Sequence, residues 1–238
     1  MAVSNVSMEV PTGSISGVIG PNGAGKSTFF NAISGLVPVS NGHILLNGKD
    51  ITARPPSSRA SIGIQRTFQS VQLLKRMTVL ENILVGLHSE IGAVYGPQRL
   101  IGRAGNARSA IERAEEVATA CSLHDVLHNE IETLTFKQQR FVEIARAMAS
   151  QPLLLMLDEP AAGLSATEVL DLEELLLSLP RQMSTTVLLV EHVISLVMKV
   201  CDQVTVLEAG EVIASGTPRE VGQDKKVIMA YFGEAMNA

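Results

Sequence analysis

A glycine-rich segment near the start of the chain constrains its fold more than any other feature. Residues 20–28 read Gly-Pro-Asn-Gly-Ala-Gly-Lys-Ser-Thr and follow directly on the apolar pair Val18-Ile19. Apolar residues at helical spacing come next, so the order predicts a strand, a tight turn and a helix. Glycines spaced in this way let successive backbone N–H groups turn inward, and the helix adds the positive end of its dipole. The segment therefore predicts a phosphate-binding loop in an α/β fold.

The polar residues of this loop have predicted tasks. The Lys26 ammonium would reach the β- and γ-phosphates of a nucleoside triphosphate, and the Ser27 hydroxyl would be a ligand for Mg²⁺. A flexible glycine turn without a ligand is the alternative, and the flanking strand and helix make it the weaker one. The nucleotide-binding residues expected in the loop are Gly20, Pro21, Asn22, Gly23, Ala24, Gly25, Lys26, Ser27 and Thr28.

A second segment carries two neighbouring carboxylates. Residues 153–157 are an apolar run with the length of a buried strand, and Asp158 and Glu159 follow it. Ligands of α/β folds bind at the carboxyl ends of strands, so Asp158 is placed to hold Mg²⁺ through its water shell. Glu159 is placed to polarise or orient an attacking water, as a general base. An ordinary acidic pair at the end of a strand is the alternative, and the phosphate-binding loop in the same chain disfavours it.

Composition excludes several classes of protein. Apolar residues make up 46% of the 238 residues and charged residues 18%, which excludes a disordered chain. The net charge of −5 argues against nucleic acid as a partner. Cys121 and Cys201 do not make a disulfide scaffold, and we expect two free structural thiols.

The sequence predicts a cytoplasmic location. No apolar run approaches the ~20 residues that span a bilayer. Residues 1–10 contain Glu9 and no Lys or Arg, unlike a secretory signal. If the protein works at a membrane, other chains must hold it there.

Strand-like and helix-like segments alternate along the chain. A largely parallel sheet covered on both faces follows from this alternation. We expect buried strands at 153–157 and 186–190 and a helix at 168–179. Residues 80–126 are expected to be helical, as an insertion into one α/β core. Hairpins are expected at 43–51 and 203–214, a loop at 55–58, and breaks in the helical region at Gly92, Gly96-Pro97 and Gly102.

Three further segments recur in one known family. They are Arg66-Thr67-Phe68-Gln69, Glu159-Pro160-Ala161-Ala162-Gly163-Leu164 and Glu191-His192. Taken alone, Gln69 and His192 are more often ordinary polar residues. In this order, with the loop and the carboxylates, they make nearly the whole chain resemble the ATP-binding subunits of ABC transporters.

The resemblance implies roles for these residues. Gln69 resembles the glutamine that contacts Mg²⁺ and the attacking water, and His192 resembles the switch histidine that contacts the γ-phosphate. The expected catalytic residues are Glu159, His192 and Gln69, and the expected metal-site residues are Ser27, Gln69 and Asp158. ATP and Mg²⁺ are the implied cofactors.

The family's architecture is also implied. It is a P-loop NTPase core with a mostly parallel sheet, a small antiparallel β part and an inserted helical subdomain. The core would comprise residues 1–68 and 151–238, and the helical subdomain about 70–150. The implied partners are transmembrane permease subunits, a second ATPase subunit and, indirectly, a solute-binding protein. The chain would lie on the cytoplasmic face of the inner membrane.

One branch of the family is the most similar, the importers of branched-chain amino acids and related small polar solutes. The segments that carry this likeness are residues 66–69, 78–86, 159–164, 210–218 and 231–234. The resemblance implies an ATPase that powers such an importer, with a groove near Gln69 and the apolar stretch Val71–Leu87 that takes a short helix of the permease. An ordinary core helix is the equally weighted alternative for that stretch.

The signature motif departs from the family's pattern. The family has Leu-Ser-Gly-Gly-Gln or Leu-Ser-Tyr-Gly-Gln, and this chain has Leu134-Thr135-Phe136-Lys137-Gln138. Thr135, Lys137 and Gln138 would face the nucleotide of the other subunit, at the start of a helix from about Gln138 through Met148. Lys137 adds charge and bulk where glycine allows close backbone approach. The hypothesis that follows is a heterodimer with one competent and one weakened ATP site.

A second departure concerns adenine. The family stacks an aromatic residue on the base, upstream of the phosphate loop, and no aromatic residue precedes Phe29 here. Either the start is truncated or misassigned, or other contacts hold the base. We expect weak ATP binding with poor selectivity for the base.

Two other functions stay open. Lys137 and the missing aromatic residue favour a regulatory module that binds nucleotide with little hydrolysis, while Asp158, Glu159 and His192 speak against it. A soluble ABC ATPase of translation or DNA repair is disfavoured, since such chains usually have two ATPase domains or a long coiled-coil insertion.

Overall fold

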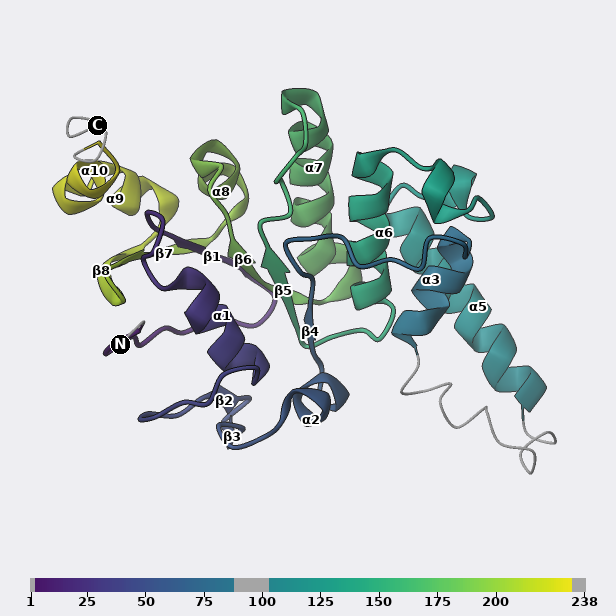
Figure 1. The fold of residues 1–238 in the computed structure, drawn as a ribbon, viewed down its shortest axis with the longest axis horizontal. Helices are drawn as coiled ribbons and strands as arrows, with labels where there is room; N and C mark the ends of the chain where they lie inside the picture. Colours follow the sequence, from purple (N-terminus) through teal and green to yellow (C-terminus); the bar gives the residue numbers. More distant parts are fainter. Residues whose placement is uncertain (1–2, 88–102, 233–238) are drawn as a thin grey trace.

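The computed structural model describes residues 3–87 and 103–232. Figure 1 shows a central sheet with helices on both faces and a group of helices beside it. The strands lie in the order β4-β5-β6-β1-β7-β8; the first five are parallel, and β8 is antiparallel to β7. Their bounds are β1 Ile15–Ile19, β4 Ile64–Arg66, β5 Leu154–Asp158, β6 Thr186–Val190, β7 Gln203–Glu208 and β8 Glu211–Gly216.

Two hydrophobic clusters cover the two faces of the sheet. On one face, Val18 and Met156 pack with Phe30 of α1 (Lys26–Ser34). On the other, Leu155 and Leu157 of β5 pack against α7 (Ala166–Met183). Successive strand residues point to opposite faces, so a continuous apolar run such as β5 serves both clusters.

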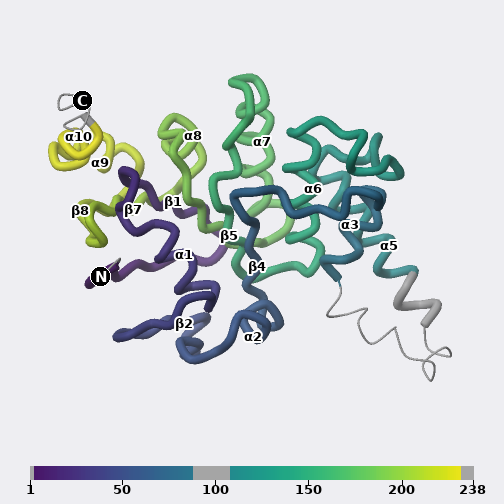
Figure 2. The backbone as a smooth tube through the Cα atoms, in the orientation of Figure 1, coloured from purple at the N-terminus to yellow at the C-terminus, as the bar shows by residue number. Residues whose placement is uncertain are grey.

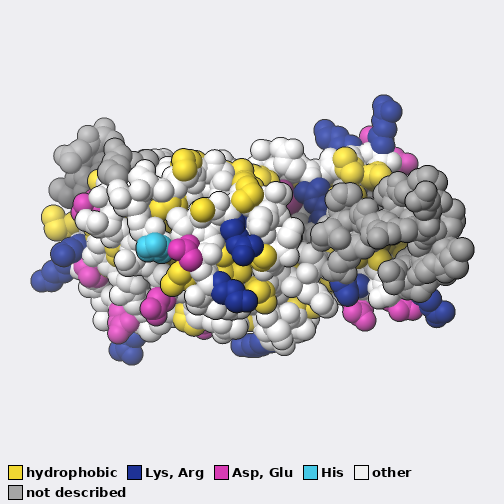
Figure 3. Space-filling view, turned by 90° about the horizontal axis from the view of Figure 1, so that it is seen from below, with side chains coloured by type: hydrophobic (Ala, Val, Ile, Leu, Met, Phe, Trp, Pro, Cys, Tyr) yellow, Lys and Arg dark blue, Asp and Glu magenta, His cyan; other side chains and the backbone are white. Residues whose placement is uncertain are grey.

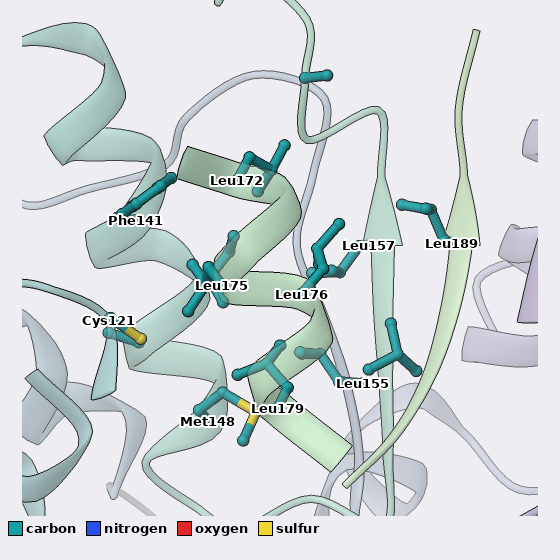
Figure 4. Close-up of a cluster of buried hydrophobic side chains, with 14 of the residues drawn as sticks. Cys121, Phe141, Met148, Leu155, Leu157, Leu172, Leu175, Leu176, Leu179 and Leu189 are labelled. Carbon is teal, nitrogen blue, oxygen red and sulfur yellow. The ribbon is translucent and has the colours of Figure 1, made fainter. Parts of the chain in front are cut away.

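The helix α7 joins the sheet to the group of helices beside it. In Figure 4 its leucines Leu172, Leu175, Leu176 and Leu179 lie between β5 and α6 (Phe136–Met148), from which Phe141 and Met148 point inward. One continuous apolar cluster therefore anchors α6 to the sheet. The side group also contains α3 (Val79–Gly86), α5 (Arg103–Ala120) and the short turns η2 (His124–Val126) and η3 (Ile131–Thr133).

Two crossings connect the side group to the sheet. In Figure 2 the chain passes from β4 to α3, and it returns from α6 to β5. Because β4 and β5 are parallel neighbours, the first crossing leaves the carboxyl end of β4, and the second enters the amino end of β5, at the opposite end of this strand pair.

The remaining elements comprise a small second sheet, the hairpin β7–β8 and further helices. The predicted hairpin at 43–51 is confirmed as the antiparallel pair β2 (Leu45–Leu46) and β3 (Lys49–Asp50), and the hairpin at 203–214 as β7 and β8. Helix α8 (Ile194–Val200) packs against β1, and helices α9 (Pro218–Gln223) and α10 (Lys225–Phe232) follow β8.

Several predicted boundaries were wrong. Residues 55–58 are not a loop, because helix α2 (Pro56–Ser61) begins there with Pro56 at a first-turn position, where the missing N–H costs nothing. Helix α7 continues through Pro180 to Met183, beyond the predicted end at 179. The signature helix starts at Phe136 rather than about Gln138.

Two further predictions concern the helical region and the cysteines. The described part of the predicted helical region 80–126 contains α3, α5 and η2, and the predicted breaks at Gly92, Gly96-Pro97 and Gly102 lie outside the described residues. Cys121 and Cys201 are buried free thiols, as predicted, and burial raises the pKa of each to about 12.

The surface mixes charged and apolar side chains. On the face drawn in Figure 3, acidic, basic and apolar groups are interspersed with other polar surface. Within residues 3–87 and 103–232, no helix combines the length and the apolar character needed to cross a bilayer.

Candidate nucleotide-binding site

The glycine-rich segment forms the turn between β1 and α1, as its sequence predicts. Gly25 caps α1 in the left-handed region at φ 99°, a conformation in which glycine is not strained. A Cβ added to Gly20 would collide with the Leu207 carbonyl oxygen of β7. The loop therefore needs glycine at both places, for conformation at Gly25 and for close approach at Gly20.

The Lys26 ammonium is held inside this loop. Its Nζ donates hydrogen bonds to the carbonyl oxygens of Gly20, at 2.6 Å, and Pro21, at 2.9 Å. The side chain is buried, and burial lowers the pKa of Lys26, while the negative charge of Glu159 acts in the opposite direction. The loop thus holds a cation at its centre and faces a carboxylate.

Glu159 joins the predicted catalytic residues. Gln69 Nε2 donates to Glu159 Oε2 at 2.9 Å, and His192 Nε2 lies 2.9 Å from Glu159 Oε1. The backbone of Glu159 is left-handed at φ 49°, which is uncommon for a residue other than glycine. Gln69 and His192, which lie 90 and 33 positions from Glu159 along the chain, therefore meet at its carboxylate.

Asp158 lies at the end of β5 and is buried. Its Oδ2 accepts a hydrogen bond from Arg66 Nη2 at 2.6 Å, within an ion pair whose side chains are 9% and 10% exposed. The sequence shows Arg66 only as a member of a motif, and its partner follows from the pairing of β4 with β5.

Glu191 is a further buried carboxylate that the sequence does not single out. It accepts hydrogen bonds from the backbone N–H groups of Ala161, at 2.6 Å, His192, at 2.9 Å, and Val193, at 3.2 Å. Burial raises its pKa. Glu191 thus connects the backbone around His192 with the backbone that follows Glu159. These hydrogen bonds hold in place the two segments whose side chains, His192 and Glu159, contact each other.

The signature residues lie at the start of α6. Thr135 caps this helix, and Gln138 completes the capping box. Lys137 Nζ lies 2.8 Å from Asp171 Oδ2 of α7. Among the described residues, no hydrogen bond or ion pair joins Thr135, Lys137 or Gln138 to the loop 20–28, so the structure does not bring these two predicted groups together within one chain.

The donor set suits Mg²⁺. This ion prefers oxygen ligands and usually keeps several waters, binding through one or two protein groups together with phosphates. Ser27, in the first turn of α1, supplies a hydroxyl, and Asp158, at the carboxyl end of β5, supplies a carboxylate. Within the described residues no group of three His, Cys, Asp or Glu side chains forms a metal cage. The residues present therefore fit a magnesium ion that arrives with a triphosphate.

An exposed apolar strip lies next to Gln69. Phe68, Leu74, Met77 and Val85 are exposed, whereas Val79, Ile83 and Leu87 of the same stretch are buried in the core. Part of Val71–Leu87 therefore packs into the core, as the core-helix alternative predicts, and the groove for a permease helix stays a prediction.

Known proteins share this sequence and fold. A family model described as "ABC transporter" matches residues 3–162, and one described as "Branched-chain amino acid ATP-binding cassette transporter" matches residues 211–236. The high-affinity branched-chain amino acid transport ATP-binding protein LivG of Salmonella typhimurium is 40% identical over 237 residues, which are 99% of this chain and 93% of LivG.

Solved structures agree with these matches. The ADP conformation of MJ1267, an ATP-binding cassette of an ABC transporter, aligns with a TM-score of 0.84 and 33% identity over 98% of this chain and 92% of that one. The dimeric post-hydrolysis state of the ATP-binding cassette MJ0796, bound to ADP and Pi, aligns with a TM-score of 0.75 and 26% identity over 92% and 91%. The chain therefore belongs to the ABC transporter family, as an ATP-binding protein of the branched-chain amino acid, LivG-like branch.

Proposed function

We propose that this chain is the ATP-binding and ATP-hydrolysing subunit of an importer for branched-chain amino acids or a related small polar solute. The observation that carries the proposal is the meeting of Gln69 and His192 on Glu159, beside the Lys26 loop. The likeness to LivG supports the choice of solute. The solute itself would be recognised by the permease and the solute-binding protein.

Each residue of the site has a defined task in hydrolysis. Backbone N–H groups of residues 20–28 and the Lys26 ammonium bind the β- and γ-phosphates. Glu159 orients and deprotonates the attacking water, and His192 contacts the γ-phosphate. Gln69 holds Glu159 in place through its hydrogen bond. A change in the position of Glu159 would therefore move Gln69 and the segment that leads to α3. Bound Mg²⁺, at Ser27, Asp158 and Gln69, would neutralise charge on the phosphates.

The proposed partners follow from the surface. Permease subunits would dock on the exposed apolar strip formed by Phe68, Leu74, Met77 and Val85, next to Gln69. A second ATPase subunit would complete each nucleotide site with its signature, as the dimeric form of MJ0796 suggests. Residues 1–68 and 151–238 would act as the catalytic core and about 70–150 as the helical subdomain, at the cytoplasmic face of the membrane.

We also propose that Lys137 weakens the nucleotide site of the partner subunit. In the described conformation its charge is paired with Asp171 at 2.8 Å, so the obstacle to the partner's phosphates is chiefly the bulk of the side chain. In a heterodimer, Lys137 would weaken only the partner's nucleotide site, and the other site would stay competent. The same observation favours the second candidate function, a nucleotide-binding regulatory module with little hydrolysis.

Phosphate release by the purified chain, with and without Mg²⁺, tests the function. The matched control is Glu159→Gln, which keeps the shape of the side chain and removes the general base. We expect magnesium-dependent release that falls by about 100-fold or more in the variant, the usual scale of general base catalysis. Nucleotide binding with equal, negligible release by both proteins would contradict hydrolysis and favour the regulatory module.

A further inference from the structure

Arg66, the last residue of β4, has its guanidinium group inside the protein. Its Nη2 donates to Asp158 Oδ2 at 2.6 Å, and its side chain is only 9% exposed. Its Nη1 donates to Asn31 Oδ1 at 2.7 Å and to Ser34 Oγ at 3.0 Å, both on α1. One head group thus connects the carboxylate at the end of β5 with the helix that follows the phosphate-binding loop.

Two aromatic rings also contact this head group. The Arg66 guanidinium carbon lies 5.5 Å from the centre of the Phe30 ring and 5.3 Å from that of Phe68. Both distances are within the range of cation–π attraction. Phe68 directly precedes Gln69, so Arg66 is linked to the segment that brings Gln69 to Glu159.

Stability alone is a poor reason for a charge at this position. Buried ion pairs can often be replaced by apolar side chains of similar volume without loss of stability. Arg66 Nε is moreover a buried donor with no hydrogen-bond partner among the described residues, which an apolar side chain would avoid. Among these contacts of Arg66, the one that pairs its positive charge with a negative charge is the one with Asp158.

We propose that Arg66 is a positioning residue for magnesium-nucleotide binding, acting through Asp158. By binding Oδ2 it fixes the carboxylate on the side of α1 and leaves Oδ1 for the water shell of the metal. Its contact with Phe68 holds the neighbouring Gln69 segment to the same carboxylate. This inference rests on the proposed function, because it requires a magnesium-bound nucleotide in the site.

The test measures binding of a fluorescent, non-hydrolysable ATP analogue to the full chain as Mg²⁺ is titrated. Groups that hold a metal ligand in place typically contribute about 10- to 100-fold to metal affinity. In Arg66→Met we expect the Mg²⁺ concentration that gives half of the maximal binding to rise by about tenfold or more. Binding of the analogue in EDTA should match that of the wild type, and Arg66→Lys, which keeps the charge, should recover part of the loss.

Arg59 offers a matched control. It is another buried arginine, 2% exposed, and it donates hydrogen bonds to the carbonyl oxygens of Ala32 and Ile33 at the end of α1. Arg59→Met removes the same group with no contact to Asp158, so we expect it to lower the thermal midpoint and leave the Mg²⁺ midpoint unchanged. Thermal unfolding of every variant establishes that the chains compared are folded.

The outcomes separate the two claims. If the wild type shows no magnesium-dependent binding, the proposed function and this inference both fail. If the wild type shows it and Arg66→Met keeps the wild-type Mg²⁺ midpoint, only the role of Arg66 is overturned. An equal shift in Arg59→Met overturns it as well. If Arg66→Met does not fold, Arg66→Lys decides: a shifted midpoint supports the inference, and a wild-type midpoint overturns it.

Discussion

At the scale of single residues, the site contains ionisable side chains whose burial disfavours their charged forms. Lys26 is a buried cation with a lowered pKa, and Glu191 is a buried carboxylate with a raised one. Both shifts come first from burial, which disfavours the charged form. Residues that cost stability in this way are common where a protein must bind or react.

The pH dependence of stability tests this for Lys26. Burial lowers its pKa below the ordinary value of 10.5. Between the pKa of the folded chain and 10.5 the unfolded chain binds more protons, so the wild type gains stability as pH rises through that window. Lys26→Met removes this effect. We therefore expect the variant to be the more stable chain at pH 7, by a margin that shrinks towards pH 10.5.

Urea unfolding of both chains at pH 7 and pH 10 gives the comparison. The other groups titrate in both proteins, so their contributions cancel in the difference. A difference that stays the same at the two pH values contradicts a lowered pKa for Lys26. The variant should also lose nucleotide binding at pH 7, because the loop then lacks its cation.

Residue roles were partly predictable. The order of motifs singled out Lys26, Asp158, Glu159, Gln69 and His192, and the structure brings Gln69 and His192 together on Glu159. The partners of Arg66 and Lys137 were not predictable, since each depends on which strands or helices become neighbours. No spacing in the sequence links Arg66 to Asp158 or Lys137 to Asp171.

At the scale of elements, α6 is connected to the segment that carries Gln69. Arg140 donates to the carbonyl oxygens of Phe68, at 3.1 Å, and Gln69, at 3.0 Å, and it pairs with Glu143 at 3.0 Å. Arg140 and Glu143 are each 1% exposed. The helix that begins with the signature is therefore fastened to the glutamine segment by one buried guanidinium group.

Removing this group should destabilise the chain strongly. Arg140→Met leaves Glu143 buried without its ion-pair partner, and breaking a buried pair in this way costs about 3–5 kcal/mol. Burial already raises the pKa of Glu143, so its charge is poorly tolerated. The double variant Arg140→Met/Glu143→Gln removes that charge and should regain part of the loss.

Urea unfolding at pH 7 measures both variants against the wild type, with unchanged slopes as the check that the transitions are comparable. A double variant less stable than Arg140→Met would contradict the account. In that case groups other than Arg140 would stabilise the charged form of Glu143.

Elements were more predictable than their ends. Strands β5 and β6 follow from apolar runs, and the two hairpins from Asn-Gly and Ala-Gly turns. The three-residue strand β4 has too short a pattern to be recognised, and it exists because β5 offers it a partner. Helix α7 continues past Pro180 to Met183, which packs against the core cluster, and sequence periodicity does not contain this effect of packing.

At the scale of the whole molecule, the proposed function assigns two surfaces of the chain to other subunits. The exposed apolar strip beside Gln69 suits the permease, and the start of α6 suits the nucleotide of a second ATPase subunit. The crossings at β4 and β5 connect both surfaces to the site. This arrangement would let hydrolysis at Glu159 change the position of the helical region.

The substitution Lys137→Gly tests the proposed asymmetry of the dimer. Glycine would let the signature backbone approach the partner's phosphates, and errors of about 1 Å in such contacts can change rates by about a hundredfold. We expect the ATPase rate of the assembled dimer to rise on the order of tenfold. Asp171→Asn, which frees the lysine without removing its bulk, should not raise the rate. An unchanged rate in the glycine variant would contradict the weakened site.

The central claim is that a magnesium-bound triphosphate occupies the loop at residues 20–28 and meets the carboxylates at the end of β5. The most direct measurement is a structure of the chain crystallised with a non-hydrolysable ATP analogue and saturating Mg²⁺. We predict the phosphates along residues 20–28, with the metal between Ser27 and Asp158. An empty loop under these conditions, or an analogue bound elsewhere, would contradict the account.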